Sequence, residues 1–403
     1  MAGNLSTSRD YRFPQREGNR FEILIDSAAF FPRMLTAIDS ARQYILLEIY
    51  LIASGVVADR FIGALLAAAK RGVRIYLLFD DYGAIGLQRR DRDRLVHRNI
   101  QMVYYNPLAS HSTLYNLYRI FWHRTPRSLY RDHRKLLLVD GKLAYTGGTA
   151  ITDAVDAPRQ PEMRWRETML EIQGAVLGDW QQLFTESWNK YAAEPLTLPV
   201  VTPLTVSNGQ PGRLTVNEAR RRMGMQRSLL GHMQRARQRI WFATAYFIPP
   251  WSIRRKLRRA ARAGVDVRLL LPGPVTDHPG ARHASHRYYG RLLKNGIRIY
   301  EYIPRFFHAK TVLCDNWVTI GSSNYDRWNL QWNLEANQEI DDLSLAATVA
   351  VMFKDDFANS REYSYSEWQQ RGWRMRALEW FWRRAELLSM KIRQRRKPWR
   401  RNK

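Results

Sequence analysis

Residues 133–140 read HRKLLLVD, and residues 308–315 repeat the pattern as HAKTVLCD. In both copies a lysine follows the histidine by two positions, and an aspartate closes the motif. Side chains two positions apart in a strand leave on the same face, so each His-Lys pair points the same way. The apolar residues after each lysine indicate a buried strand, and each aspartate opens a turn. A histidine beside a cation, once in each half of the chain, suits chemistry at a phosphoryl centre.

The segments before the two motifs also resemble each other. LLAAAKRGVRIYLLF, from Leu65, aligns with LRRAARAGVDVRLLL, from Leu257, and each reads as a helix, a glycine and a strand. Helices are expected at 28–41, 59–71 and 253–262, and strands at 21–25, 44–51, 73–79, 240–247 and 265–271. Strand, helix, strand is the β-α-β pattern of a mostly parallel sheet. The duplication predicts an α/β fold of two similar lobes, each a mixed, mostly parallel sheet flanked by helices.

Composition divides the chain into five parts. We expect a polar lead-in at 1–20, a first lobe at 21–193, a linker at 194–213, a second lobe at 214–370 and a basic tail at 371–403. The first lobe is the longer one between the shared landmarks, and residues 110–130 are the candidate insertion.

The charge balance predicts an anionic partner. The 403 residues include 64 Lys and Arg against 37 Asp and Glu, a net charge of +27, which suits nucleic acid or an anionic membrane surface. The single cysteine, Cys314, excludes an internal disulfide and is expected to be a small buried residue. No apolar run reaches about 18 residues, and the N-terminus lacks the apolar region of a secretory signal. If the protein works on a membrane, we expect it to lie on the surface.

Two segments are candidates for that contact. In 371–403, Trp, Phe and Leu alternate with many Arg and Lys, which is typical of a helix lying in a membrane interface. A C-terminal helix packed on the domain is an equally good interpretation. The apolar and basic segment 110–130 is either an interfacial lip or part of the core.

Two H-x-K-x4-D motifs, each followed by a turn of small residues, resemble the phospholipase D superfamily. WNLEANQEIDD, from Trp332, and FDDYG, from Phe79, resemble bacterial cardiolipin synthases of the type that lacks N-terminal transmembrane helices. The resemblance covers roughly residues 21–357. One motif alone is a weak signal, whereas two copies inside a duplicated frame argue against coincidence.

The resemblance implies a phosphatidyltransferase whose active site lies where the lobes meet, with no metal and no cofactor. In this assignment His133 attacks phosphorus to form a phosphatidyl-histidine. His308 protonates the departing glycerol and then deprotonates the acceptor hydroxyl, although the residues alone leave open which histidine attacks. Lys135 and Lys310 are expected to hold the phosphate oxygens. Asp140 and Asp315, the last residues of the motifs, are expected to support the site without carrying protons.

The resemblance also names supporting residues. Glu167 and Glu335 are each expected to orient the histidine of their own half; the alternative for Glu167 is a surface residue paired with Arg166. Phosphate contacts are expected from the two small-residue turns, at Gly147, Gly148, Ser322 and Asn324. The first turn departs from the family pattern, because Ala150 stands where the family usually has Asn.

Three further features are ambiguous. Glu48, alone in an apolar strand, must find a partner and is either a structural ion-pair member or a pocket residue. Asp80 and Asp81 follow a strand and fit strand-end caps or a substrate loop better than metal ligands. The cluster of His278, His283 and His286 fits an active-site loop better than a zinc site.

The expected reaction condenses phosphatidylglycerol with a second phosphatidyl donor and releases glycerol or another headgroup alcohol. We expect a peripheral enzyme on the cytoplasmic side of the cell membrane, and no nucleic-acid partner; the oligomeric state is left open. With water as acceptor the same site would make a phospholipase D. The rival classes are a nuclease of the same superfamily and a catalytically idle membrane scaffold.

Overall fold

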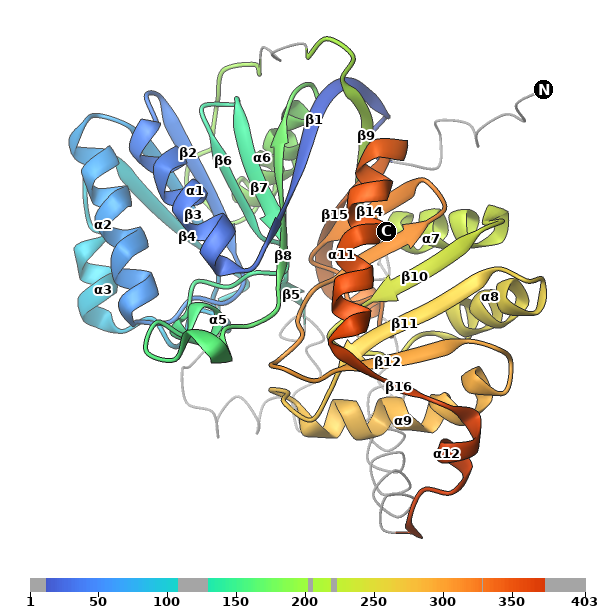
Figure 1. The fold of residues 1–403 in the computed structure, drawn as a ribbon. Helices are drawn as coiled ribbons and strands as arrows, with labels where there is room; N and C mark the ends of the chain where they lie inside the picture. The colour runs from blue at the N-terminus through green and yellow to red at the C-terminus, as the bar shows by residue number, and fades with distance from the viewer. Residues whose placement is uncertain (1–11, 108–129, 202–205, 219–222, 328, 374–403) are drawn as a thin grey trace, which may run out of the picture.

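The computed structural model describes residues 12–107, 130–201, 206–218, 223–327 and 329–373 (Figure 1). The strands of the first half are β1 (Arg16–Ile25), β2 (Tyr44–Ile49), β3 (Arg74–Asp80), β4 (Ile100–Tyr105), β5 (Arg131–Asp132), β6 (Leu136–Val139), β7 (Leu143–Gly147) and β8 (Thr168–Gln173). Those of the second half are β9 (Gln210–Glu218), β10 (Arg239–Ala243), β11 (Asp266–Pro272), β12 (Arg298–Tyr302), β13 (Thr311–Cys314), β14 (Trp317–Gly321), β15 (Asn333–Asp341) and β16 (Ser360–Tyr363).

The helices follow the same division. The first half contains α1 (Ser27–Ser40), α2 (Val56–Lys70), α3 (Arg89–Arg94), α5 (Asp153–Asp156), α6 (Leu177–Trp188) and a 3-10 turn at Pro161–Met163. The second half contains α7 (Gly224–Arg235), α8 (Trp251–Arg262), α9 (Pro279–Leu293), α10 (Asn329–Trp332), α11 (Leu343–Ala358) and α12 (Tyr365–Gln369).

The two halves repeat one strand order. From the centre outward the first runs β1-β8-β7-β6-β2-β3-β4 and the second β9-β15-β14-β13-β10-β11-β12, with β16 added at the second edge. Pairing of β1 with β9 joins them into one mixed sheet. The predicted two-lobed α/β fold is therefore confirmed. The expectation of mostly parallel sheets is wrong, because only β2-β3-β4 and β10-β11-β12 are parallel within these two series. The motif hairpins β6-β7 and β13-β14 add antiparallel strands.

The predicted elements correspond to observed ones with shifted ends. The helices expected at 28–41, 59–71 and 253–262 are α1, α2 and α8, and the strands expected at 44–51 and 73–79 are β2 and β3. β1 begins at Arg16, inside the expected lead-in, and β9 begins at Gln210, inside the expected linker. Cys314 is buried in β13, as predicted. The segments 110–130 and 371–403 lie outside the described residues, apart from 130 and 371–373.

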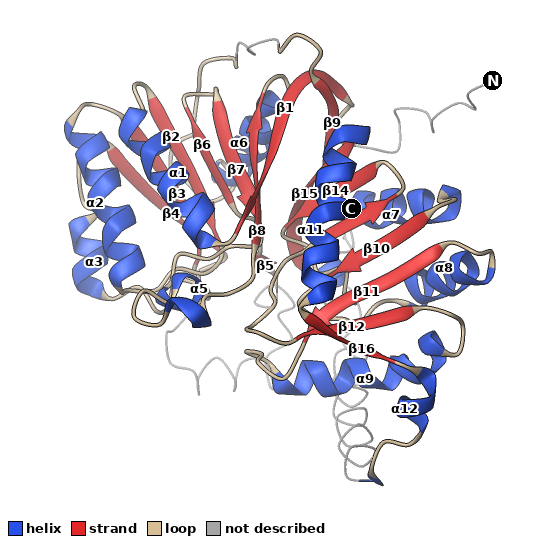
Figure 2. Ribbon diagram, in the orientation of Figure 1, coloured by secondary structure: helices blue, strands red, loops and turns tan. Residues whose placement is uncertain are grey.

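The apolar side chains form three clusters, which explains why the central strands are apolar on both faces. In β2, Ile45 and Leu47 pack with α1 and α2, whereas Tyr44 and Leu46 face a central cluster. On the other side of the molecule, α7, α8 and α9 pack against the outer face of the second half-sheet (Figure 2). Residues of α6 and α11 join the central cluster together with strands of both halves. The two lobes therefore share the central cluster, which is the shared core of the molecule.

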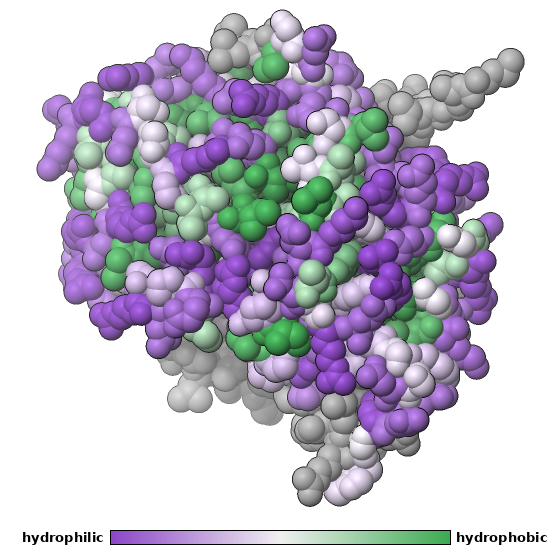
Figure 3. Space-filling model, in the orientation of Figure 1, coloured by the Kyte–Doolittle hydropathy of each residue, from purple (hydrophilic) through white to green (hydrophobic). Residues whose placement is uncertain are grey.

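Hydrophilic residues predominate on the face shown in Figure 3, with smaller apolar areas between them. Within the described part of the chain, no helix combines the length and hydropathy needed to cross a bilayer.

Candidate active site

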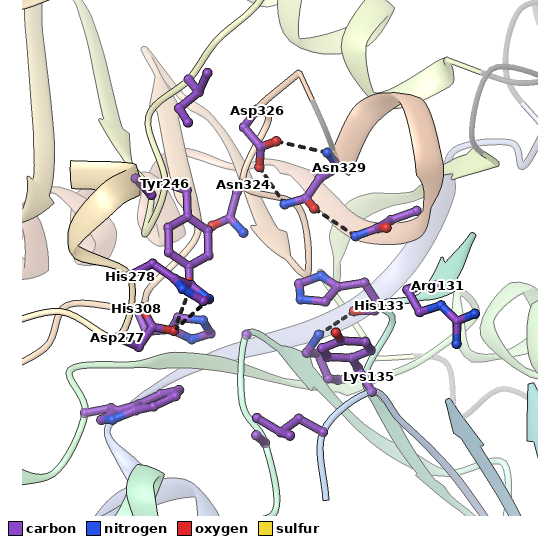
Figure 4. Close-up of a pocket in the computed structure, with 18 of the residues that line it drawn as sticks. Arg131, His133, Lys135, Tyr246, Asp277, His278, His308, Asn324, Asp326 and Asn329 are labelled. Atoms are coloured by element: carbon purple, nitrogen blue, oxygen red, sulfur yellow. Dashed lines mark hydrogen bonds and ion pairs between the residues drawn. The ribbon is translucent and has the colours of Figure 1, made fainter. Parts of the chain in front are cut away.

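One pocket of about 930 Å³ takes residues from both motifs (Figure 4). His133 and His308 face it from the two halves, and Lys135 lines it beside His133. Lys310 is fully buried behind His308, with its Nζ 2.9 Å from the Nδ1 atom of that ring. The structure thus brings both predicted His-Lys pairs to one site between the lobes.

Each pair lies in an extended segment that leads into a motif strand, β6 or β13. The Nζ atom of Lys135 donates to the backbone carbonyl of His133 at 2.5 Å, and Lys310 makes the same contact with His308 at 2.5 Å. This contact folds each lysine back beside its own histidine. Lys135 lines the pocket there, whereas Lys310 is buried against His308.

The two lead-in segments pair with strands of the opposite half. β5 forms a short parallel ladder with β15, and the His133 N–H donates to the Leu334 carbonyl at 3.0 Å. In the other half, the His308 N–H donates to the carbonyl of Arg166, which comes just before β8, at 2.9 Å. Each histidine is therefore held along the segment that carries the other half's glutamate.

The glutamates are exchanged between the halves. The Nδ1 atom of His133 lies 3.1 Å from Oε2 of Glu335, and the Nδ1 atom of His308 lies 2.6 Å from Oε2 of Glu167. The expectation that each glutamate orients the histidine of its own half is wrong, because the exchanged backbone pairing brings it to the other one. Both glutamates are fully buried and engage the Nδ1 side of each ring, so the Nε2 side is the one that can meet a substrate. In the second half the Lys310 Nζ also lies 3.0 Å from Nε2 of His308.

The small-residue turns hold the glutamates differently. In the second half the Ser322 hydroxyl donates to Glu335. In the first half Gly148 stands at that place, and a Cβ there would lie 2.6 Å from Oε1 of Glu167. Gly148 is required because the carboxylate occupies the space of a side chain.

Only two of the four residues expected to contact phosphate lie at the pocket surface. Gly148 and Asn324 line the pocket, whereas Gly147 and Ser322 do not. Asn324 Oδ1 lies 3.3 Å from the Thr244 hydroxyl, and its buried Nδ2 has no hydrogen-bond partner among the described residues. At the matching place in the first half, Ala150 presents only a methyl group, so the two turns offer unequal contacts.

Burial shifts the proton affinity of these groups. It lowers the pKa of both histidines, and the charge of Lys310 lowers the pKa of His308 further, so both rings are neutral without substrate. It also lowers the pKa of Lys135 to about 7 and that of Lys310 to about 8, and raises the pKa of Glu167 to about 6. An anionic phosphodiester would favour the charged lysines and draw protons into the pocket.

The motif aspartates do not join the pocket. The Asp140 carboxylate accepts the backbone N–H groups of residues 42–44 at 2.8–2.9 Å, where the chain enters β2. Asp315 accepts those of residues 237–239 at the entry to β10, at the same distances. Their contacts support the hairpin ends and reach neither histidine.

Asp80 is a strand-end cap that also holds the first motif. One of its carboxylate oxygens accepts the Tyr82 and Gly83 N–H groups, and the other accepts the Asp132 N–H at 2.8 Å. Its pKa rises to about 6 because the side chain is buried.

Glu48 is a buried ion-pair member. It lies 2.8 Å from Arg134 Nη2, which also bonds Asp132 at 2.7 Å. Strand register places Ala243 at the position of Glu48 in the second half, because Glu48 pairs with Leu136 and Ala243 with Thr311. This charged cluster belongs to the first lobe alone.

The three clustered histidines divide between two places, with His283 and His286 still in ring contact at a centroid distance of 5.8 Å. His278 lines the pocket, whereas His286 is buried with its Nε2 2.8 Å from Glu301 Oε1. Within the described ranges, no group of three His, Cys, Asp or Glu side chains is arranged to hold a metal ion.

Several pocket residues were not predicted. Tyr50 and Tyr246 meet the two histidine rings edge-on, at centroid distances of 4.8 and 6.4 Å. The other unpredicted lining side chains include Arg131, Trp165, Asp277, Asp326, Asn329 and Asn333. Tyr50 and Tyr246 follow the duplicated strands β2 and β10, so the repeat itself carried a signal for them. The remaining residues lie on loops or at the ends of strands and helices, at places that the repeat does not mark.

Comparison with known proteins agrees with this geometry. The model of the family described as "Cardiolipin synthase, PLD-like domain" matches residues 34–185 and 229–357. Cardiolipin synthase 1 of Bacillus cereus is 30% identical over 381 residues, covering 92% of this chain and 72% of the relative. Cardiolipin synthase B of Escherichia coli O6:H1 is 30% identical over 350 residues, covering 83% and 79%.

A solved structure shares the fold. Phosphatidylserine synthase of Haemophilus influenzae superimposes with a TM-score of 0.69 at 13% identity, covering 95% of this chain and 98% of that one. The family model spans both lobes and both motifs, and the curated relatives match over most of the chain. The chain belongs to the cardiolipin synthase family of phospholipase D-like proteins and is a phosphatidyltransferase of that type.

Proposed function

We propose that the protein transfers a phosphatidyl group to phosphatidylglycerol through a phosphatidyl-histidine, releasing glycerol or another headgroup alcohol. The observation that carries this proposal is one pocket lined by His133, Lys135 and His308, with Lys310 buried against His308 and each histidine backed by a buried glutamate. A nucleophile, a proton carrier and cations for the phosphate oxygens are what exchange at a phosphodiester requires.

In the first step, Nε2 of His133 attacks phosphorus and the bond to the headgroup oxygen breaks. Protonated His308 donates its Nε2 proton to that oxygen, so the alcohol leaves neutral. Glu335 stabilises the positive charge that develops on His133, and Glu167 fixes the orientation of the His308 ring. Lys135 and Asn324 contact the phosphate oxygens from the pocket wall, and Lys310 adds positive charge from behind His308.

In the second step, neutral His308 accepts the proton of the incoming hydroxyl. The new oxygen–phosphorus bond forms as the bond between phosphorus and His133 breaks, and both imidazoles return to their starting states. With phosphatidylglycerol as both donor and acceptor, the products are cardiolipin and glycerol. We also propose that the enzyme meets this anionic substrate at a membrane surface, to which its net charge of +27 is complementary.

The deciding experiment is mass spectrometry of lipids after incubation of the purified protein with phosphatidylglycerol vesicles, with and without EDTA. Cardiolipin together with glycerol is the expected result. Phosphatidic acid as the main product would make the enzyme a hydrolase. Unchanged lipid beside a degraded plasmid control would contradict the lipid reaction altogether.

A further inference from the structure

The pocket wall carries a positive charge on the side of His133 and a negative charge on the side of His308. On the first-half side, the Arg131 guanidinium lines the pocket, 3.3 Å from Asp80 and over the Tyr82 ring. On the second-half side, the Asp277 carboxylate lines it, beside Tyr246 and His278 (Figure 4). An anionic phosphodiester is attracted to the first side and repelled by the second.

Asp277 is held in place and keeps acceptor capacity. The Tyr246 hydroxyl donates to its Oδ2 at 2.6 Å, and the edge of the same tyrosine ring is turned toward His308. His278 Nε2 lies 3.9 Å from the same Oδ2 atom. Among the described residues Asp277 forms no ion pair with a lysine or arginine, although the chain carries a net charge of +27. An ionised carboxylate has about four lone-pair sites, so one tyrosine leaves room for further donors.

We propose that Asp277, held by Tyr246, forms a polyol subsite that selects the glycerol headgroup of the acceptor lipid. This inference rests on the proposed function and assigns the acceptor side of the pocket. One hydroxyl of the headgroup lies at Nε2 of His308, and a neighbouring hydroxyl donates to Asp277. The first oxygen bonds to phosphorus as the bond from phosphorus to His133 breaks, and its proton passes to His308.

Hydroxyls fit this wall better than an ammonium group. A hydroxyl both donates and accepts, and the wall offers the Asp277 carboxylate as an acceptor. Asn324 and Asn333 also line the pocket, and each holds one buried polar atom that has no partner among the described residues. An ammonium group only donates, and it would enter a pocket that already holds Arg131 and Lys135. Burial and the charge of Lys310 lower the pKa of His308, and the charge of Asp277 opposes this lowering.

The subsite predicts how the phosphatidyl-enzyme divides between competing alcohols. Labelled glycerol and 1-propanol have the same carbon chain, but only glycerol has a second hydroxyl for Asp277. Both acceptors, with ethanolamine as a third, are supplied with phosphatidylglycerol vesicles, and the labelled phosphatidylglycerol, phosphatidylpropanol and phosphatidylethanolamine are quantified by mass spectrometry. The product ratio reports acceptor capture alone, because all products come from one intermediate.

Asp277→Asn should lower the ratio of glycerol product to propanol product by about tenfold, since it removes a hydrogen bond to a charged acceptor. Tyr246→Phe should shift the ratio in the same direction by less, because the carboxylate stays but loses its hydrogen bond. Asp355→Asn, an exposed carboxylate of α11 that does not line the pocket, is the matched control and should keep the wild-type ratio.

An unchanged ratio in both pocket variants would overturn the subsite. A selective loss of the ethanolamine product would overturn the polyol assignment in favour of an ammonium site. If the wild-type protein transfers to no alcohol, the proposed function itself fails, which is a different result from transfer with an unaltered ratio.

Discussion

Each active-site histidine has one ring nitrogen committed to a carboxylate from the opposite half. The shorter contact, 2.6 Å, is that of His308 with Glu167, and His133 lies 3.1 Å from Glu335. In the proposed reaction His133 is the nucleophile and His308 carries the proton, so the exchanged pairing predicts a different defect for the loss of each glutamate. Loss of Glu335 should impair the nucleophile, whereas loss of Glu167 should impair the proton carrier.

A donor with a nitrophenyl headgroup separates these effects, because its anion leaves without a proton. With phosphatidylglycerol, Glu335→Gln and Glu167→Gln should each lower the rate by about 100-fold, within the range of general acid–base contributions. With the nitrophenyl donor, the burst of nitrophenolate should recover in Glu167→Gln and stay slow in Glu335→Gln. The reverse pattern would assign the roles the other way round.

The buried groups also set the pH dependence. Glu167, with its pKa raised to about 6, loses its charge as the pH falls through that value. Lys135 and Lys310, with pKa values lowered to about 7 and about 8, lose theirs as the pH rises through those values. We expect kcat/KM for phosphatidylglycerol to peak between about pH 6 and 7 and to fall on both sides. A profile that is flat up to about pH 9 would rule out a role for the two lysine charges.

At the scale of the elements, the two motif aspartates hold the chain where strands β2 and β10 begin. Asp140 and Asp315 each collect three backbone N–H groups where β2 and β10 begin, from turn residues with φ near +53° and +52°. β2 and β10 in turn support the motif strands β6 and β13. The two aspartates of the motifs therefore fix where strands begin and take no part in the pocket.

Asp140→Ala and Asp315→Ala should each lower the free energy of unfolding by about 2–3 kcal/mol, since the N–H groups lose a charged acceptor. The turnover number of the folded fraction should stay within about threefold of wild type. Urea unfolding beside kcat at low temperature measures both quantities. A large drop in kcat at unchanged stability would instead place the aspartates in the reaction.

Much of the fold and both His-Lys pairs could be predicted from sequence, because the same local pattern occurs once in each half of the chain. The elements α2, β3, α8 and β11 follow from periodicity and their glycines, and the two His-Lys pairs follow from spacing. The exchange of Glu167 and Glu335 could not be predicted, because it depends on β5 pairing with β15 and on Arg166 meeting Phe307. Such contacts join segments far apart in the chain, and local pattern carries no information about them.

At the scale of the molecule, the shared core makes the two lobes interdependent. Trp180 of α6 donates to Gln338 of β15, and Arg166 forms a buried ion pair with Asp356 of α11 at 2.7 Å. Residues 1–193 expressed alone should therefore be inactive and lack cooperative thermal unfolding, and co-expression with 194–403 should restore activity. An autonomous, cooperatively folded first half would contradict the shared core.

The surface charge is distributed unequally between the duplicated helices. Residues 63, 64, 66 and 67 of α2 are Gly, Ala, Leu and Ala, and the aligned positions of α8 are Arg255, Lys256, Arg258 and Arg259. Burial, and then the neighbouring Arg291, lower the pKa of Arg258, so this face carries unrelieved repulsion. Because α2 occupies the same place without these charges, the fold does not require them. An anionic membrane surface would relieve the repulsion.

Replacing these four cations of α8 by Gln, which has similar helix propensity, should weaken flotation with phosphatidylglycerol vesicles at low salt by at least about tenfold. The control replaces four exposed cations of the first half, Arg42, Arg74, Arg98 and Lys142, and changes the net charge by the same amount. A smaller loss in the control would place the contact on α8, and added salt should reduce the difference. Equal losses would show that net charge alone drives binding. Retention on DNA that exceeds vesicle binding at matched salt would contradict the membrane as the partner of this face.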